Sequence, residues 1–181
     1  AYHGLKFHDT FGPYAFIIYS IAVSLRDLGM TMAPQNAFQT LLGLETLSLR
    51  MKKHVSNSIK IANWLEKHPK IEKVTYAGLK SSEYFNTAKS ILPKGAGALF
   101  TISLKDGYEA CMKMISKLNL FSHVSNLGDT RSLIIHPAST VHRQLTEEQQ
   151  KNAGLAPNVI RLSIGIEDPK DLINDLRNAL E

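Results

Sequence analysis

The 181-residue chain is poor in cysteine and in long hydrophobic runs. One cysteine, Cys111, excludes an internal disulfide framework and any paired-cysteine zinc or redox motif. It favours a reducing, cytoplasmic location. The longest apolar run, at 14–25, has twelve residues with two serines, which is too short to span a bilayer. We therefore expect no disulfide-stabilised secreted domain and no membrane partner.

The excess of positive charge is small. There are 21 Lys and Arg against 16 Asp and Glu, a net charge of +5, and the basic residues are scattered along the chain. Because they form no stripe, we expect no nucleic-acid partner. With 44% apolar and 20% charged residues, the composition is that of an ordinary globular protein. A chain of this size buries about 70% of its unfolded surface, enough for one core.

The first half of the chain predicts two helices. Residues 1–13 are polar and aromatic and indicate a loop or an extended arm. Pro13 suits the first turn of a helix that Gly29 would end. The second helix opens at 33–36, contains no Pro or Gly from position 44 to 68, and would be roughly 45 Å long. Its apolar positions are three and four residues apart: Leu41, Leu44, Leu47, Met51, Val55, Ile59, Ala62 and Leu65.

The second half alternates short strands with helices. Strand patterns lie at 71–76, 97–104, 121–126, 132–136 and 159–164. Helical patterns lie at 82–92, 108–118, 146–154 and from 168 to the end. This order predicts an α+β fold, with helices packed against one side of a largely antiparallel sheet.

One charged residue lies inside a strand pattern. Arg161 occupies the last strand, where the residues two positions away are Val159 and Ser163. Burying an unpaired charge is costly, and arginine suits bidentate carboxylate binding, so Arg161 is a candidate ligand for a carboxylate. From the residues alone, a salt bridge to Glu167 or Asp168, or a position facing solvent, is equally open.

A polar loop lies between two apolar strands at 125–129, with the sequence SNLGD. Loops of this kind can bring side chains and backbone N–H groups to the edge of a site. Taken by itself, the pattern favours a plain connection between strands.

Three other patterns predict little chemistry. The segment 95–98 lacks the GK[ST] ending of a phosphate loop and precedes a strand, so it predicts a turn. His136 and His142 are separated by Pro137 and share no helical face, so we expect no metal site. A hydrolase that uses Ser139 and His136 is a remote alternative, because no GxSxG motif occurs.

Several longer stretches together resemble a known family. Residues 125–140, SNLGDTRSLIIHPAST, resemble the signature of the Cys/Met-metabolism enzymes that use pyridoxal 5′-phosphate (PLP). Residues 161–168, RLSIGIED, resemble the second C-terminal motif of that family, and 43–50, GLETLSLR, its long linker helix. Residues 2–5 and 11–13, with Asn126 before Leu-Gly-Asp, narrow the resemblance to the O-acetylhomoserine sulfhydrylase branch.

The resemblance implies a function. In the family a lysine holds PLP, the cofactor acts as an electron sink, and acetate leaves O-acetylhomoserine before sulfide or a thiol adds, giving homocysteine or methionine. It assigns Arg161 to the substrate α-carboxylate and Asn126 to an assisting role. It also implies a homo-oligomer.

The resemblance further implies that the chain is part of a larger enzyme. Residues 1–35 would be the end of the large PLP-binding domain and the crossing segment, and 36–181 the small C-terminal domain with its long helix. The Ser/Thr-Lys motif, the phosphate-binding glycine loop and the aspartate for the pyridine nitrogen find no match here, and Ala1 replaces a starting Met. We expect a C-terminal piece that has no catalytic residue, binds no cofactor and is inactive alone. The alternatives are a related PLP-dependent γ-lyase or γ-synthase, or a stand-alone interaction module.

Overall fold

The computed structural model describes residues 2–181, apart from the side chains of Glu147 and Lys151. The chain divides into two compact units between positions 46 and 47. In the described part of the chain, no helix is both long and apolar enough to cross a membrane.

The first unit is helical throughout most of its length. Its elements are η1 (Tyr2–Gly4), α1 (Phe7–Phe11), η2 (Gly12–Tyr14), α2 (Ala15–Tyr19), the π-helical η3 (Ser20–Leu25), α3 (Arg26–Leu28) and α4 (Pro34–Glu45). The loop or extended arm predicted at 1–13 is therefore wrong for most of the described residues, which are helical. The aromatic side chains fold the segment back on itself, because the Phe7 ring lies 5.4 Å from Tyr2 and 5.1 Å from Tyr19.

The helix predicted to end at Gly29 is confirmed. Gly29 caps α3 in the left-handed conformation, with φ 63°, which glycine adopts without strain. The single long helix predicted next is two helices, because Thr46 (φ −103°, ψ 3°) leaves the helical conformation between α4 and α5 (Leu47–Leu65). Thr46 is β-branched, which makes it a poor helix former.

The buried face of α5 differs from the predicted apolar stripe. Met51 and Ile59 are exposed, and Val55 is half-buried. The side chains that face the core are instead His54, Asn57, Ser58, Ile61, Ala62 and Leu65. Half of this face is polar, so α5 contacts backbone groups as well as the apolar core.

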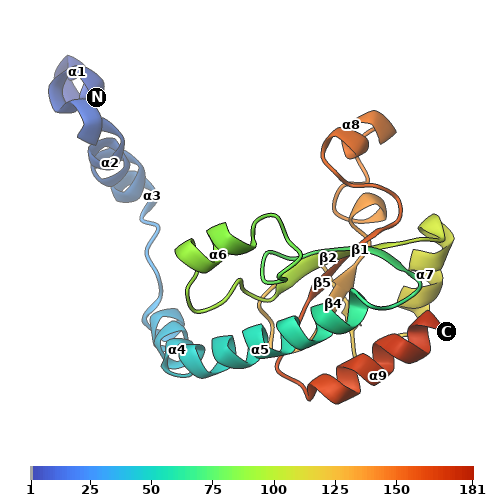
Figure 1. Cartoon of the computed structure of the whole chain (residues 1–181). Coiled ribbons are helices and arrows are strands. Elements are labelled where there is room, and N and C mark those ends of the chain that lie inside the picture. The colour runs from blue at the N-terminus through green and yellow to red at the C-terminus, as the bar shows by residue number, and fades with distance from the viewer. Residues whose placement is uncertain (1) are drawn as a thin grey trace. The chain divides into compact units, whose positions relative to one another are not determined.

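The second unit is built on a five-stranded sheet in the order β1-β2-β5-β4-β3 (Figure 1). The strands are β1 (Ile71–Thr75), β2 (Leu99–Leu104), β3 (Ser122–His123), β4 (Leu133–Ile135) and β5 (Val159–Ser163). Every neighbouring pair is antiparallel except β3 and β4. The predicted α+β fold with a largely antiparallel sheet is confirmed.

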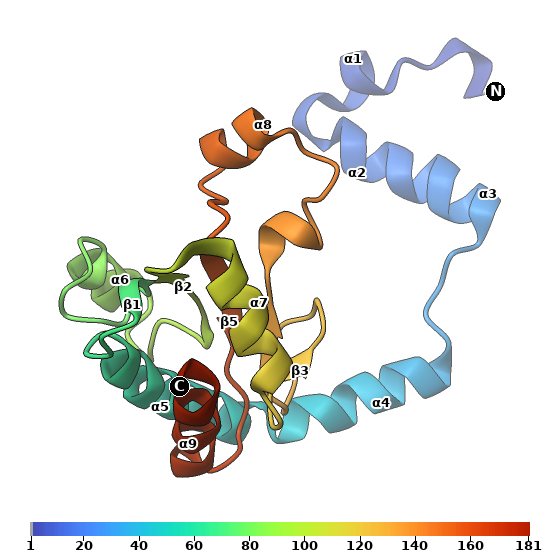
Figure 2. The same cartoon turned by 90° about the vertical axis from the view of Figure 1, so that its right-hand side faces the viewer.

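Helices cover one face of this sheet. α5, α7 (Gly107–Lys117) and α9 (Pro169–Leu180) pack together over it, as Figure 2 shows. Their side chains close one core that includes Ile61, Phe100, Ile102, Cys111, Ile160, Leu162 and Leu176. As predicted, Asp168 caps α9 by accepting a hydrogen bond from Lys170 N–H (2.7 Å), and Pro169 occupies the first turn.

The remaining elements are short: α6 (Phe85–Ile91), η4 (Pro137–Ser139) and α8 (Glu147–Asn152). Because side chains alternate along a strand, the face of the sheet opposite the helices carries Thr101 of β2 and Arg161 of β5, which pair in register. In β4, Ile135 pairs with Arg161 from the other side. This second face positions the candidate site.

Candidate functional site

Arg161 lies at the centre of the sheet face that the helices leave uncovered. Its neighbours Ile160 and Leu162 are fully buried in the core, so the guanidinium must point the other way. It is half-buried and lines a cavity of about 460 Å³, together with Lys73, Thr101 and residues of the 137–156 segment. The sequence predicted the strand, but not which neighbours form this cavity.

Neither acidic residue considered as a salt-bridge partner binds Arg161. Glu167 accepts hydrogen bonds from Ser132, at 2.6 Å from the backbone N and 3.0 Å from Oγ. Asp168 accepts from Lys170 N–H at the start of α9. Within the described residues, no carboxylate lies in ion-pair distance of Arg161. The guanidinium is therefore available to an external anion.

The structure brings Asn126 to Arg161. Arg161 Nη2 donates to the backbone carbonyl oxygen of Asn126 at 3.4 Å. Asn126 Oδ1 accepts from Leu127 N–H at 2.9 Å, and the Asn126 side chain is exposed. Among the described residues nothing accepts from its amide NH₂. An arginine and an amide donor side by side are suited to binding one carboxylate.

The loop that carries Asn126 is held by further hydrogen bonds. Gly128 N–H donates to Ser163 Oγ at 3.2 Å, two residues along β5 from Arg161. Asp129 accepts from Arg131, at 3.0 Å from the backbone N–H and 3.3 Å from the guanidinium. These bonds, the backbone one first, hold the pKa of the Asp129 carboxyl below its usual range.

His136 and Ser139 are also brought together, but as part of a turn. His136 Nε2 donates to the Pro157 carbonyl at 2.8 Å, so Nδ1 is left as an acceptor for Ser139 Oγ (2.9 Å) and Ser139 N–H (3.2 Å). The ring is buried, and both nitrogens are used. The pair caps η4, and we interpret it as structural.

The remaining sequence patterns have simple explanations. The segment 95–98 is a turn into β2, as predicted: Gly95 and Gly97 have positive φ, and Gly97 O accepts from Tyr76. In the part of the chain that the structure describes, no three His, Cys, Asp or Glu side chains are grouped to hold a metal.

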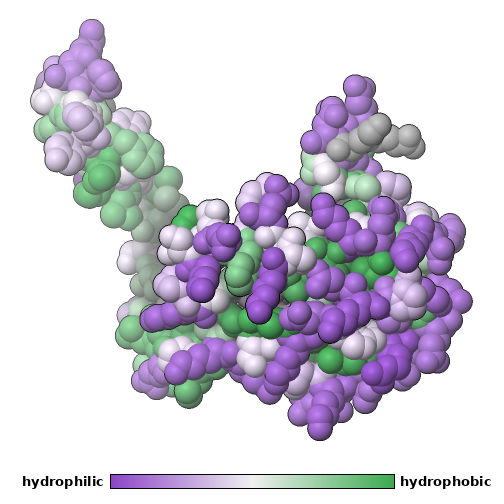
Figure 3. All heavy atoms as spheres, in the orientation of Figure 1, coloured by the Kyte–Doolittle hydropathy of each residue, from purple (hydrophilic) through white to green (hydrophobic). Residues whose placement is uncertain are grey.

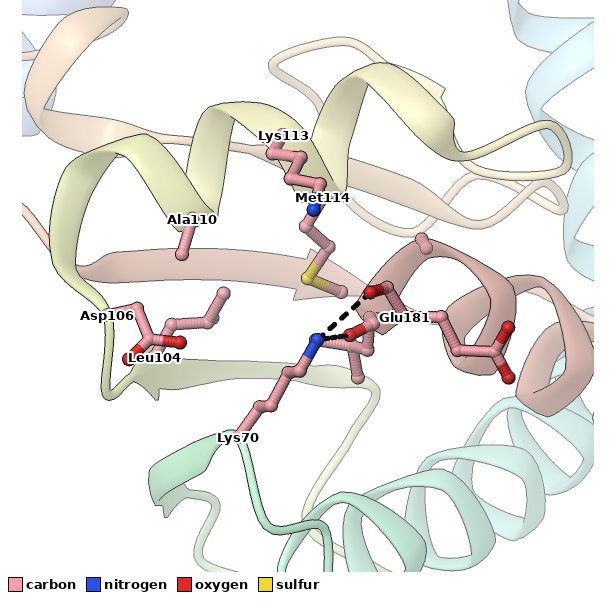
Figure 4. Close-up of a pocket in the computed structure, with 9 residues that line it drawn as sticks. Lys70, Leu104, Asp106, Ala110, Lys113, Met114 and Glu181 are labelled. Carbon is pink, nitrogen blue, oxygen red and sulfur yellow. Dashed lines mark hydrogen bonds between the residues drawn. The ribbon is translucent and has the colours of Figure 1, made fainter.

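A small cavity of about 80 Å³ lies away from Arg161, beside α7 and the end of α9 (Figure 4). One of the two lysines that line it, Lys70, donates to the backbone oxygens of Leu180 and Glu181. Through these hydrogen bonds the amine of Lys70 connects the start of β1 to the end of α9. We assign the cavity no chemistry.

The family is settled by comparison with known proteins. The family model for Cys/Met metabolism PLP-dependent enzymes matches residues 13–181. The chain belongs to this family.

Two similar relatives within the family are both O-acetyl-L-homoserine sulfhydrylases. The chain is 45% identical to O-acetyl-L-homoserine sulfhydrylase 1 of Thermus thermophilus, over 99% of this chain and 42% of that protein. It is 46% identical to O-acetyl-L-homoserine sulfhydrylase of Leptospira meyeri, over 100% of this chain and 43% of that protein.

Solved structures agree. One from Campylobacter jejuni, assigned as an O-acetylhomoserine (thiol)-lyase and carrying pyridoxyl phosphate on a lysine, superposes with a TM-score of 0.87, 46% identity, and coverage of 99% of this chain and 42% of that one. O-acetylhomoserine sulfhydrylase of Wolinella succinogenes superposes with a TM-score of 0.78 and 30% identity, over 97% of this chain and 46% of that one. The chain thus spans less than half the length of these relatives.

Sequence reasoning missed the residues that support the site. Asn57 and His54 of α5 bind the backbone of the turn that follows β5, at 2.6 to 3.0 Å. Glu167 and Ser132 bind one another behind the loop. A signal existed for the α5 pair, because polar residues three positions apart on the buried face of a helix must find partners. For Glu167, no local pattern indicates Ser132, 35 residues away, as its partner.

Proposed function

We propose that this chain is the substrate-carboxylate-binding part of a PLP-dependent transferase that replaces the acetate of O-acetylhomoserine with sulfide or a thiol. The observation that carries the proposal is the position of Arg161. It lies on the uncovered face of the sheet, beside Asn126, with no carboxylate partner among the described residues. The names of the relatives supply the substrate class.

In this proposal Arg161 binds the α-carboxylate through its planar guanidinium, and the NH₂ of Asn126 donates a further hydrogen bond to the same group. The two side chains fix the orientation of the amino acid, and so the direction in which its reacting carbons point. Arg161 suits this task because its strand is central in the sheet and cannot shift without moving both neighbouring strands.

The residues of the cavity do not by themselves fit the cofactor. PLP supplies an electron sink when it is bound. The lysine that lines this cavity, Lys73, is exposed, whereas an amine becomes a nucleophile at neutral pH through desolvation or a neighbouring cation. We therefore propose that the remaining length seen in the relatives holds the cofactor.

We propose that 1–35 is the end of the large PLP-binding domain with the crossing segment, and 36–181 the small domain. Apolar exposure in the first unit supports this: Phe16 is 81%, Leu28 69% and Tyr14 68% exposed. Figure 3 shows green, apolar residues over these helices. Exposed surface of this kind requires a partner. In the working enzyme we propose a second domain and a homo-oligomer as those partners.

The test compares the 181-residue chain with the longer enzyme. Each is incubated with PLP, O-acetylhomoserine and sulfide, and homocysteine is measured, together with the visible absorbance of lysine-bound cofactor. We expect product and absorbance only with the longer enzyme. Turnover by the 181-residue chain would contradict its role as a part. If the longer enzyme formed no product from O-acetylhomoserine and used another γ-substituted substrate instead, the substrate assignment would be contradicted.

A further inference from the structure

Glu167 lies just beyond β5 and connects that strand to the start of β4. Its Oε1 accepts a hydrogen bond from Ser132 N–H at 2.6 Å, and its Oε2 from Ser132 Oγ at 3.0 Å. Ser132 Oγ in turn accepts from Gly165 N–H at 2.9 Å. Ser132 is fully buried, so these bonds are shielded from water. We call Glu167, Ser132 and Gly165 the Glu167 clamp.

The clamp is held in place from the helix side of the sheet. Asn57 Nδ2 donates to the backbone carbonyls of Glu167 (2.8 Å) and Gly165 (3.0 Å), and His54 Nδ1 donates to that of Ile164 (2.6 Å). Both donors lie on the buried face of α5. The backbone of Glu167 is therefore fixed by a long helix that does not contact the uncovered face.

The clamp adjoins the C-terminal end of the loop that carries Asn126. Ser132 directly follows the loop 126–131, and Ile166 N–H donates to the Thr130 carbonyl at 2.9 Å. At its other end the same loop is bound by Ser163 through Gly128 and by Arg161 through Asn126. These two bonds, of 3.2 and 3.4 Å, are long and neutral at the acceptor, whereas both bonds to Glu167 end on a carboxylate and the one from Ser132 N–H is short, at 2.6 Å.

We propose that Glu167 is a positioning residue for the carboxylate site. By binding Ser132 it fixes the loop, and the loop places Asn126 where its amide and the Arg161 guanidinium reach one anion. The ligand in this inference rests on the proposed function. The effect of Glu167 on the loop does not depend on it. Both oxygens of Glu167 accept hydrogen bonds from Ser132, and Glu167 makes no ion pair with Arg161.

The test uses the ¹⁵N-labelled 181-residue chain and two readouts. One is hydrogen exchange at the Gly128 and Ile166 amides, which reports the loop without any ligand. The other is the dissociation constant of O-acetylhomoserine, followed by NMR. The variants are Glu167→Gln, which replaces one of the two acceptor oxygens with an NH₂ donor, and Ser132→Ala. Glu83→Gln, on an exposed side chain, is the matched control.

We expect Glu167→Gln and Ser132→Ala to speed exchange at Gly128 and Ile166 and to leave the β2 and β5 amides protected. Both should raise the dissociation constant, by about tenfold, because misplacing a binding group by a fraction of an ångström is costly. The double variant should bind no more weakly than the weaker single variant, since the two residues act as one unit.

The outcomes separate the two proposals. Unchanged Gly128 exchange in both clamp variants would overturn the clamp, as would loss of the whole fold in both, because the bonds would then hold the fold and not the loop. If Arg161→Ala left ligand affinity unchanged, the proposed function would fail. If the unsubstituted chain did not bind, the expected effect of Glu167 on affinity in this chain would be overturned. In both cases exchange at Gly128 would still decide whether the clamp positions the loop.

Discussion

Gly165 lies directly against the backbone of Thr130, so closely that a Cβ atom at Gly165 would collide with the Thr130 carbonyl oxygen and with Glu167 Oε2. The same approach brings Ile166 N–H to that carbonyl, at 2.9 Å. Glycine is needed at position 165 because there is no room for a side chain. The turn after β5 and the loop before β4 thus fit together at one point without any side chain between them.

Gly165→Ala should therefore destabilise the second unit. Inserting a methyl group into a packed site costs about 1–3 kcal/mol, and here backbone has to move. Urea unfolding, followed by circular dichroism, measures the change. Gly43→Ala is the control, because an added Cβ there meets no described atom within 4 Å apart from its own helix backbone and chain neighbours, and alanine favours a helix. Equal stability of the two variants would contradict the close fit.

Tyr76 should make the folded chain less stable at high pH. Burial raises the pKa of its phenol to about 12, and its hydroxyl donates to Gly97 O at 2.7 Å. The folded state holds the proton more tightly, so the contribution of Tyr76 is complete below pH 10 and is lost as the pH rises towards 12.

Tyr76→Phe should lower the free energy of unfolding by about 1 kcal/mol at neutral pH, through the lost hydrogen bond. It should also flatten the fall in stability above pH 10. Denaturant unfolding at a series of pH values measures both effects, with Tyr84→Phe, an exposed tyrosine, as control. A steep alkaline loss that persists in Tyr76→Phe would assign that loss to another group.

Cys111 should be unreactive in the folded chain. Its side chain is fully buried, and burial raises the pKa of the thiol to about 11. At pH 8 a thiol reagent should label it only as fast as the chain unfolds, and at once in urea. Labelling in native buffer at the urea rate would show that α7 does not cover the thiol as the structure describes.

The 181-residue chain should self-associate through its first unit. We expect dimers or larger oligomers in sedimentation, because side chains such as Phe16 expose apolar surface. Phe16→Ser should shift the distribution towards monomer. Ile91→Ser is the control, since Ile91 is 70% exposed in the second unit. A monomer at every concentration would contradict the proposed role of this surface.

The sequence predicted those elements whose causes are local. The alternation of Val159 to Ser163 was enough to place Arg161 on one face of a strand, and Asp168 with Pro169 marked the start of α9. The charge in an apolar strand made Arg161 a candidate ligand for a carboxylate, with a salt bridge or a solvent-facing position equally open. The family resemblance assigned the binding role, which stays a proposal. The role of Asn126 likewise came from the family resemblance and stays a proposal.

Other features depend on contacts between distant segments. Aromatic contacts fold residues 2–19 into helical turns, where the local composition indicated an arm. Hydrophobic spacing correctly predicted that Ala62 and Leu65 of α5 are buried. It missed His54, which is buried because it binds a backbone carbonyl 110 residues away. The partner of Glu167 is likewise set by how two strands meet. Such pairings appear only when the strand order is known.

The proposed role of Arg161 is tested most directly by kinetics of the longer enzyme that contains this chain. With O-acetylhomoserine as substrate, Arg161→Ala should reduce the stabilisation of the transition state by ~2–5 kcal/mol. This is the cost of removing one side of a buried charge pair. The measured quantity is kcat/KM. Arg177→Ala, on α9 across the sheet, is the control and should leave kcat/KM close to that of the unsubstituted enzyme. An unchanged kcat/KM in Arg161→Ala would contradict the assignment of the substrate carboxylate to this strand.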